Sequence, residues 1–153
     1  MKICDQFSYK GALDIIEKKE TILHELKEVI QEDLKFGMDK PSMIKKYVAN
    51  KFNQMGWGDK VPVGNSKLTI NFKKLNVGVC FQLGNVARTY ADILKLMELY
   101  SKNSIEAGVI YVAHSIEAKK MGQNHAYYER LVKELYLFRD IITIPILVIG
   151  LSN

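Results

Sequence analysis

The segment INFKKLNVGVCFQLGNVAR, at residues 70–88, is the part of this sequence that most restricts the possible folds. Residues 67–72 and 76–83 alternate in the manner of β-strands, with a gap short enough for a hairpin. Residues 86–102 then repeat apolar side chains at spacings of three and four, which predicts an amphipathic helix. A hairpin followed directly by such a helix predicts a sheet with helices on its faces.

The remaining segments extend this pattern along the chain. Apolar spacing and turn residues predict helices at 11–33, from Pro41 onward and at 126–138, and strands at 107–113 and 143–150. The predicted order is therefore α-α-β-β-α-β-α-β, which indicates an α/β fold. In the helix at 86–102, the expected buried stripe consists of Val86, Tyr90, Ile93, Met97 and Tyr100.

Composition limits the class of protein. The 153 residues are enough for a single domain with a real core, and we expect residues 1–153 to form one. Hydrophobic residues make up 48% and charged residues 25%, which is typical of a globular chain. No apolar run reaches membrane-spanning length, so no membrane association is expected. Two cysteines and the lack of a signal-peptide pattern favour a reducing cytoplasm.

The net charge of +5 permits nucleic-acid binding without establishing it. Much of the excess lies in lysine doublets spread along the chain, at 18–19, 45–46, 73–74 and 119–120. Such doublets are also typical of solvated surfaces, so charge alone leaves both interpretations open.

Strand geometry sorts the hairpin side chains into two sets, because neighbours in a strand point to opposite faces. On the first strand Leu68, Ile70 and Phe72 are expected on one face, opposite Asn71. On the second strand Val77, Val79, Phe81 and Leu83 share a face, opposite Gly78, Cys80 and Gln82. If the strands pair, Asn71, Cys80 and Gln82 converge on one face. A sheet with one half-exposed polar face explains the same pattern.

These residues carry a family resemblance. The pattern Asn71, eight residues, Cys80, one residue, Gln82, followed by Gly84–Asn85 and a helix, resembles the catalytic motif of the PD-(D/E)XK nucleases. It is most similar to the BglII/BstYI group of type II restriction endonucleases, and the likeness covers most of the chain. The resemblance implies a restriction-endonuclease-like mixed β-sheet flanked by helices.

The resemblance also implies a Mg²⁺ site, from which this sequence departs. The family has Asp and Glu at the positions of Asn71 and Cys80, and its Gln is retained as Gln82. In the family those two carboxylates hold Mg²⁺ beside the scissile phosphate. An amide and a soft thiol are poor replacements for a hard cation. The resemblance therefore places a degenerate metal site at Asn71 and Cys80.

Other side chains could substitute for the missing carboxylates. Glu25 and Glu28, on the first predicted helix, could each supply one metal ligand, or could be ordinary solvated charges. Cys80 could act as a nucleophile only with a base such as His114 or His125, which nothing in the sequence brings near it. A buried, inert thiol is the simpler interpretation of Cys80.

Two segments are candidates for DNA contact. Asn85 is placed to cap the helix at 86–102, and in the resembled enzymes this position also faces the bases. Arg88 lies in the first turn, where the helix dipole disfavours a cation, so either a nearby phosphate or solvent accounts for it. Gln123, Asn124 and His125 lie in a polar segment that matches the family's major-groove loop, although a plain surface loop fits them too.

The sequence thus predicts a DNA-binding, type II restriction-endonuclease-like protein with a degenerate Mg²⁺ site and weak or no cleavage. It is expected to bind double-stranded DNA as a homodimer through the helices near 10–33 or 86–102. Two alternatives remain. One is an active Mg²⁺-dependent nuclease completed by other residues. The other is an intracellular interaction protein that kept the fold and lost DNA binding.

Overall fold

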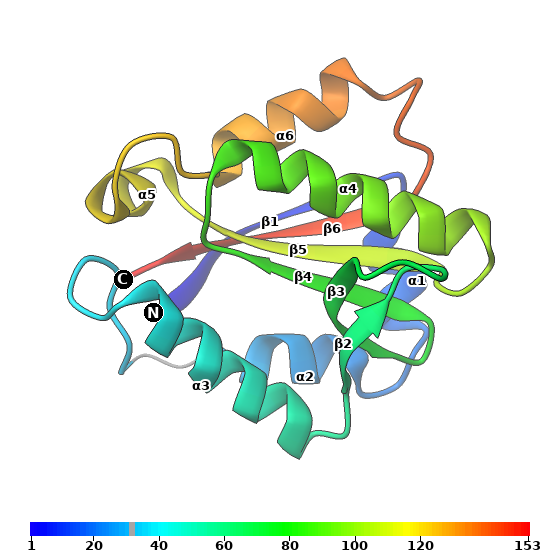
Figure 1. Cartoon of the computed structure of the whole chain (residues 1–153), viewed down its shortest axis with the longest axis horizontal. Coiled ribbons are helices and arrows are strands. Elements are labelled where there is room, and N and C mark those ends of the chain that lie inside the picture. The colour runs from blue at the N-terminus through cyan, green and yellow to red at the C-terminus, as the bar shows by residue number, and fades with distance from the viewer. Residues whose placement is uncertain (31–32) are drawn as a thin grey trace.

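The computed structural model describes residues 1–30 and 33–153, which build a six-stranded sheet covered by helices (Figure 1). The strands are β1 (Lys2–Tyr9), β2 (Gly58–Pro62), β3 (Thr69–Lys74), β4 (Val77–Gln82), β5 (Ala107–Ala113) and β6 (Ile146–Ser152). The helices are α1 (Ala12–Glu17), α2 (Ile22–Glu28), α3 (Pro41–Gln54), α4 (Val86–Ser101), α5 (Ser115–Met121) and α6 (Tyr128–Leu137).

The sheet is mixed, with strand order β1-β6-β5-β4-β3-β2. The central strands β4, β5 and β6 are parallel, and β1, β3 and β2 add antiparallel pairs at the two sides. Parallel strands need crossover connections, which α4 supplies between β4 and β5, and α5 with α6 between β5 and β6. The predicted mixed sheet flanked by helices is confirmed.

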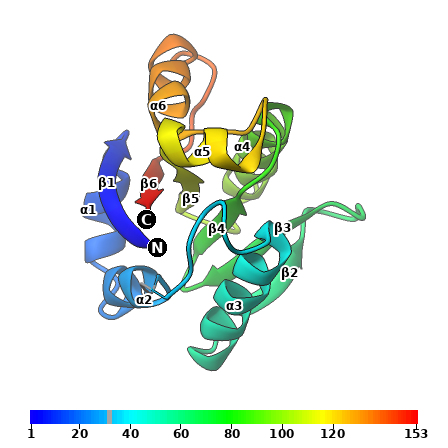
Figure 2. The same cartoon turned by 90° about the vertical axis from the view of Figure 1, so that its left-hand side faces the viewer.

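Helices cover both faces of the sheet, with α1, α2 and α3 on one side and α4 and α6 on the other (Figure 2). The short helix α5 follows β5, and its buried Ala118 joins the core cluster of the first side. Val77, Val79, Phe81 and Leu83 face the first side, as the alternation predicts, while Cys80 faces the second. Thr69 and Asn71 of β3 are exposed, but every residue of β4 is buried, so the half-exposed polar face is wrong for β4. Gly78 and Gly108 allow α4 to pack closely on the sheet and bury β4, because a Cβ on either glycine would approach Leu96 of α4 to 3.1 Å or less.

The β3–β4 ladder runs from Lys74↔Val77 to Phe72↔Val79 and ends there. Beyond that point Ile70 packs on the α4 side, whereas Phe72 stacks on Phe52 of α3 at 4.3 Å. The expectation that Leu68, Ile70 and Phe72 share one face is therefore wrong, and Leu68 is exposed. The irregular segment falls at Asn71, the first residue of the motif.

Four parts of the fold differ from the prediction. The first helix is divided into α1 and α2 by a turn at 18–21, which lets Ile16 and Ile22 both reach the core. A separation of six residues would place them well apart around one continuous helix. The predicted end of that helix includes residues 31–32, which lie outside the described ranges. Strands β1 and β2 and helix α5 were not predicted, and β1 is a largely exposed edge strand without alternation.

Candidate functional site

A cavity of about 360 Å³ lies at the motif, between β3, β4, α3 and α4. We call it the motif cavity, and its lining residues are Lys45, Leu68, Thr69, Asn71, Phe81, Gln82, Arg88, Ala91, Asp92 and Lys95. Two of the three motif residues, Asn71 and Gln82, are thus brought to one cavity. Titratable side chains from two helices join them there, so the cavity combines amides, one carboxylate and several cations.

Asn71 joins the two strands where their ladder ends. Its side-chain Oδ1 accepts a hydrogen bond from the backbone N–H of Phe81 at 2.9 Å, in place of a backbone acceptor. Half of the oxygen's acceptor capacity is therefore used within the fold. An Asp at this position could accept the same bond, so the local structure is compatible with a carboxylate here.

Gln82 is held in a buried polar network with Asp92 and Lys95. Its Oε1 accepts from the backbone N–H of Gly84 at 2.8 Å, and its Nε2 donates to Asp92 Oδ2 at 2.5 Å. The other Asp92 oxygen contacts Lys95 Nζ at 2.7 Å, and Lys95 also donates to the Thr69 carbonyl at 3.0 Å. Because every end of the Gln82 amide has a partner, its orientation is fixed.

Cys80 has no exposed surface and belongs to the core cluster under α4. Burial raises the pKa of its thiol well above the ordinary value, and the charge of Asp92 raises it further. The protonated thiol is a weak nucleophile and a poor metal ligand. The histidines considered as bases have other surroundings: His114 lies between Asp5 and Glu129, and His125 lies in the loop described below.

The structure does not bring Glu25 or Glu28 to the motif cavity. Glu25 accepts hydrogen bonds from Trp57 Nε1 at 2.6 Å and from Lys74 Nζ, at the far end of β3 from the motif cavity. Glu28 is exposed and lies 3.3 Å from His24. The structure thus places neither residue where it could complete the metal site, because Glu25 contacts the Lys74 end of β3, Glu28 is paired with His24, and neither lines the motif cavity.

A second hollow, of about 340 Å³, continues from the motif cavity along α3. We call it the α3 hollow. It shares Lys45, Asn71 and Phe81 with the motif cavity, and its other lining residues are Lys46, Ala49, Asn50, Asn53, Asp59, Lys60 and Phe72. The two are adjacent, and their polar lining includes lysines, one arginine and amides together with two carboxylates, Asp59 and Asp92.

The residues present do not fit the Mg²⁺ site that the resemblance implies. Mg²⁺ prefers anionic oxygen, but Asn71 and Gln82 offer amide oxygens that already accept backbone hydrogen bonds. The carboxylate of Asp92 is engaged by Gln82 and Lys95. Within residues 1–30 and 33–153, no three His, Cys, Asp or Glu side chains are grouped so that they could hold a metal ion.

The two segments predicted to contact DNA lie side by side. Asn85 caps α4, because its Oδ1 accepts from the backbone N–H of Ala87 at 2.8 Å. The backbone around Asn85 pairs with the polar loop. The Val86 N–H donates to the Asn124 carbonyl at 2.9 Å, and Asn85 forms an isolated antiparallel β-bridge with His125. The α4 N-terminus and the loop at 122–127 therefore form one surface, which the sequence could not show.

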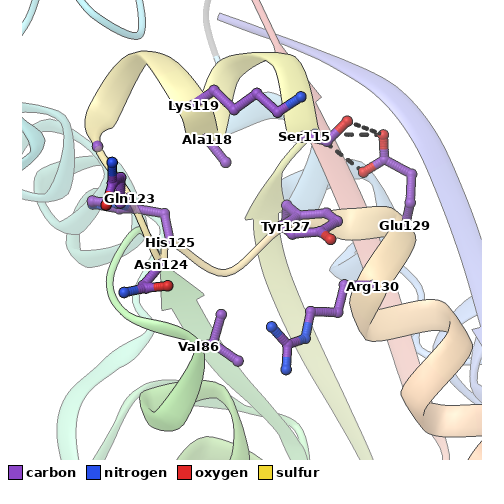
Figure 3. A pocket seen from close by; sticks show the side chains of 11 residues that line it. Val86, Ser115, Ala118, Lys119, Gln123, Asn124, His125, Tyr127, Glu129 and Arg130 are labelled. Carbon is purple, nitrogen blue, oxygen red and sulfur yellow. Dashed lines mark hydrogen bonds between the residues drawn. The ribbon is translucent and has the colours of Figure 1, made fainter.

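A large open cavity of about 730 Å³ lies between this loop, α5 and α6. We call it the loop cavity, and it is lined by Val86, Ser115, Ala118, Lys119, Gly122, Gln123, Asn124, His125, Tyr127, Glu129 and Arg130. Figure 3 shows Gln123, Asn124 and His125 at one end, and Arg130 extending from α6 toward Val86. Arg88 lies on the motif cavity instead, and Asn85 lines neither cavity.

Glu129 is fixed at the wall of the loop cavity. It accepts hydrogen bonds from the backbone N–H and the hydroxyl of Ser115, at 3.1 Å and 2.7 Å (Figure 3). Burial acts to raise the pKa of Glu129, but the Ser115 bonds and the nearby His114 outweigh it, and the pKa is lowered. Gln123 and Asn124 are exposed, which leaves their amides open to an incoming group.

Asp92, Lys45 and Lys95 were missed by sequence reasoning. The buried stripe of α4 is Thr89, Asp92, Ile93, Leu96 and Leu99. Of the expected stripe only Ile93 is buried, so the true stripe is displaced around the helix. On the correct stripe, Asp92 is a charged residue among apolar ones, which is an unusual position unless the charge is paired. That signal could have identified it.

Comparison with known proteins agrees with this geometry. The crystal structure of restriction endonuclease BglII complexed with a DNA 16-mer superposes with a TM-score of 0.83 at 17% identity, covering 100% of this chain and 77% of that one. The crystal structure of free BglII gives a TM-score of 0.77 at 19% identity, covering 100% and 80%. A search of curated protein sequences finds no match. The chain therefore has the restriction-endonuclease fold.

A family model described as restriction endonuclease BglII/BglIII matches residues 4–151. This protein belongs to the BglII/BglIII family of restriction endonucleases. Within the described residues, none of its helices has the length and apolar character needed to cross a membrane.

Proposed function

We propose that this protein binds double-stranded DNA through a restriction-endonuclease scaffold and cleaves it weakly or not at all. The observation that carries the proposal is the makeup of the motif cavity. Neutral amides, Asn71 and Gln82, occupy two motif positions, and the thiol of Cys80 is buried at the third. Such a set lacks the two anionic oxygens that a catalytic Mg²⁺ needs.

Several features favour DNA as the partner. The family is one of restriction endonucleases, and one of the similar structures is BglII complexed with a DNA 16-mer. The motif cavity and the α3 hollow are rich in cations, which suits a phosphate backbone. The adjacent loop cavity presents the exposed amides of Gln123 and Asn124, groups that can pair with base edges.

We also propose a homodimer, since two equivalent sites match a palindromic duplex. The exposed side of α4 favours this helix as a contact. Leu94 is 65% exposed and Leu68 is 59% exposed, and both line an apolar hollow of about 370 Å³ together with Val63 and Ala91. Light scattering that finds only a monomer at high protein concentration would argue against the dimer.

An active Mg²⁺-dependent nuclease is the second candidate, and Asp92 is the observation that favours it. Its carboxylate lines the motif cavity beside Asn71 and Gln82. If Lys95 moved away, Asp92 could offer an anionic oxygen. This candidate requires that Mg²⁺ support cleavage by the unmodified protein and that Asp92→Asn abolish it.

The decisive test is the double variant Asn71→Asp with Cys80→Glu, assayed for Mg²⁺-dependent nicking of plasmid DNA. Both carboxylates would serve the same ion, so either change alone should restore little and their effects should not add. The control is Asn71→Asp with Cys80→Gln, because a glutamine at position 80 matches the size of a glutamate but lacks its charge. We expect cleavage from the first pair and background activity from the control.

A stability readout accompanies this assay because Cys80 is fully buried. A Glu there places a carboxylate in the core near Asp92, which should lower the melting temperature without metal. Mg²⁺ should recover part of the loss in the double variant, since an ion bound only by the folded state stabilises it. Cleavage by the unmodified protein with Mg²⁺ would establish the second candidate. Failure of the double variant to bind or cut would favour an interaction protein.

A further inference from the structure

Lys45 and Arg88 enter the motif cavity from different helices. Lys45 lies on α3 and Arg88 lies in the first turn of α4, and these helices cover opposite faces of the sheet (Figure 2). Both side chains nevertheless line the same cavity, beside Asn71 and Gln82. They meet there because β3 leaves the β4 ladder at Asn71, which opens the sheet between the two helices.

The charges around this cavity do not balance. Its lining cations are Lys45, Arg88 and Lys95, and its lining carboxylate is Asp92. Asp92 is already paired with Lys95 at 2.7 Å. Across residues 1–30 and 33–153, neither Lys45 nor Arg88 makes an ion pair or a side-chain hydrogen bond. Lys45 and Arg88 therefore line the cavity as two positive charges without an ion-pair partner in the described part of the chain.

The two cations are also close enough to affect each other. Burial lowers the pKa of Lys45, and the charge of Arg88 lowers it further, against an opposing effect of Asp92. Holding two like charges together is unfavourable unless a ligand compensates them. A single anion between Lys45 and Arg88 would relieve this repulsion and would also replace the water lost by Lys45.

We propose that Lys45 and Arg88 form a clamp that holds one backbone phosphate of duplex DNA without a metal ion. The inference rests on the proposed DNA-binding function and specifies how the altered site is used. A phosphodiester carries one negative charge and two free oxygens, which suit the planar fork of Arg88 and the point charge of Lys45. The N-terminal end of the 16-residue helix α4 adds a favourable dipole.

The neutral motif residues explain why no metal is needed. Two carboxylates beside a phosphate repel it, and a divalent cation must then bridge the charges. Asn71 and Gln82 exert no such repulsion, so the cations act on the phosphate directly. The α3 hollow continues the path with Lys46 and Lys60, where the neighbouring phosphates of the strand would lie.

The test measures binding of a mixed-sequence, fluorescein-labelled duplex by anisotropy, over a series of salt concentrations, in EDTA and in Ca²⁺. The intact protein should bind equally well in both. Lys45→Gln and Arg88→Gln should each weaken binding about tenfold in EDTA and reduce the salt slope by about one. The matched control is Lys18→Gln, which removes one exposed charge from the end of α1 and should change neither quantity.

Asn71→Asp supplies the converse test. A carboxylate beside the clamp should weaken binding about tenfold in EDTA, and Ca²⁺ should restore it. Binding by the intact protein only with Ca²⁺, or unchanged affinity and salt slope in both clamp variants, would overturn the clamp. If those variants bind normally while Lys119→Gln and Arg130→Gln weaken binding, DNA binding stands and the clamp alone fails. If the intact protein binds no duplex at all, the proposed function fails with it.

Discussion

Glu25 and Asp92 are two carboxylates on opposite faces of the sheet, and their immediate surroundings are alike. Each is paired with a lysine, Lys74 at 2.8 Å and Lys95 at 2.7 Å, and each accepts a further bond from a planar N–H donor. That donor is the Trp57 indole for Glu25 and the Gln82 amide for Asp92. The side chains are 12% and 10% exposed. By burial and partners alone, the two cannot be told apart.

The two carboxylates differ in the groups that surround their hydrogen-bond partners. Around Glu25 the polar groups are paired with one another, because Thr21 also donates to the carboxylate and Lys74 also donates to the Met55 carbonyl. Around Asp92 the network faces a cavity that also holds Lys45 and Arg88. A buried carboxylate–lysine pair is therefore no sign of function in itself. The unbalanced charge on an open cavity is what marks the Asp92 side as a binding site.

The largest effect is expected from Asp92→Asn, which should lower the free energy of unfolding by about 3 kcal/mol in chemical denaturation. The new amide would point its NH₂ at the NH₂ of Gln82 or, in the opposite orientation, at the ammonium of Lys95, and both of these groups are donors. Rotating the Gln82 amide does not help, because its NH₂ would then face the Gly84 N–H. One pair of donors is left facing each other in either arrangement.

Exchanging the two groups should repair this defect. The double variant Gln82→Glu with Asp92→Asn lets a carboxylate at 82 accept from both Gly84 and the new amide, so it should recover about half of the lost stability. Additive losses in this double-mutant cycle would contradict the network.

Glu25→Gln should lower the free energy of unfolding by about 2 kcal/mol. Lys74 would lose its carboxylate partner, and the NH₂ of the new amide would face a donor in either orientation. In contrast to changes at the motif cavity, Glu25→Gln should leave DNA affinity and its salt dependence unaltered. Thermal unfolding and anisotropy on the same preparation separate these effects. A loss of DNA affinity at constant stability would show that the Glu25 side is also functional.

The contribution of the Glu25 network to the free energy of unfolding should depend on pH in the acid range. Burial acts to raise the pKa of Glu25, but hydrogen bonds from Lys74, Thr21 and Trp57 outweigh it, so the pKa lies below the ordinary value of 4.5. A carboxyl with a lowered folded-state pKa stabilises the protein fully above its unfolded-state pKa. That stabilisation is lost as the pH falls through the folded-state pKa. The stability gap between the intact protein and Glu25→Gln should be constant above pH about 5 and shrink below 4.5.

The smallest effect is expected at Asn71, on the strand that separates the two carboxylates. Asn71→Ala removes the acceptor of the Phe81 N–H and should cost about 1 kcal/mol. Asn71→Asp keeps an acceptor and should change stability by less than about 0.5 kcal/mol. Denaturant titrations of both variants check this. A large loss in Asn71→Asp would mean that the position does not tolerate a carboxylate.

Local patterns predicted much of this protein correctly. The hairpin, α4, β5 and the two faces of β4 follow from alternation or from helical spacing, which act between near neighbours. The Asn85 cap is likewise a contact two residues long. The same reasoning failed for β1, whose exposed edge position gives no alternation, and for Asp92, which was hidden by a stripe placed wrongly around α4.

What the sequence by itself determined is therefore the chemistry of the motif: two amides and a thiol at a nuclease spacing, with a capped helix after them. The tertiary structure decided which residues surround that motif. It set Glu25 against Trp57 and Lys74, brought Lys45 and Arg88 to Asn71, and laid the loop at 123–125 beside Asn85. These contacts join residues far apart in the chain, and their approach depends on strand order and helix packing, which no local pattern encodes.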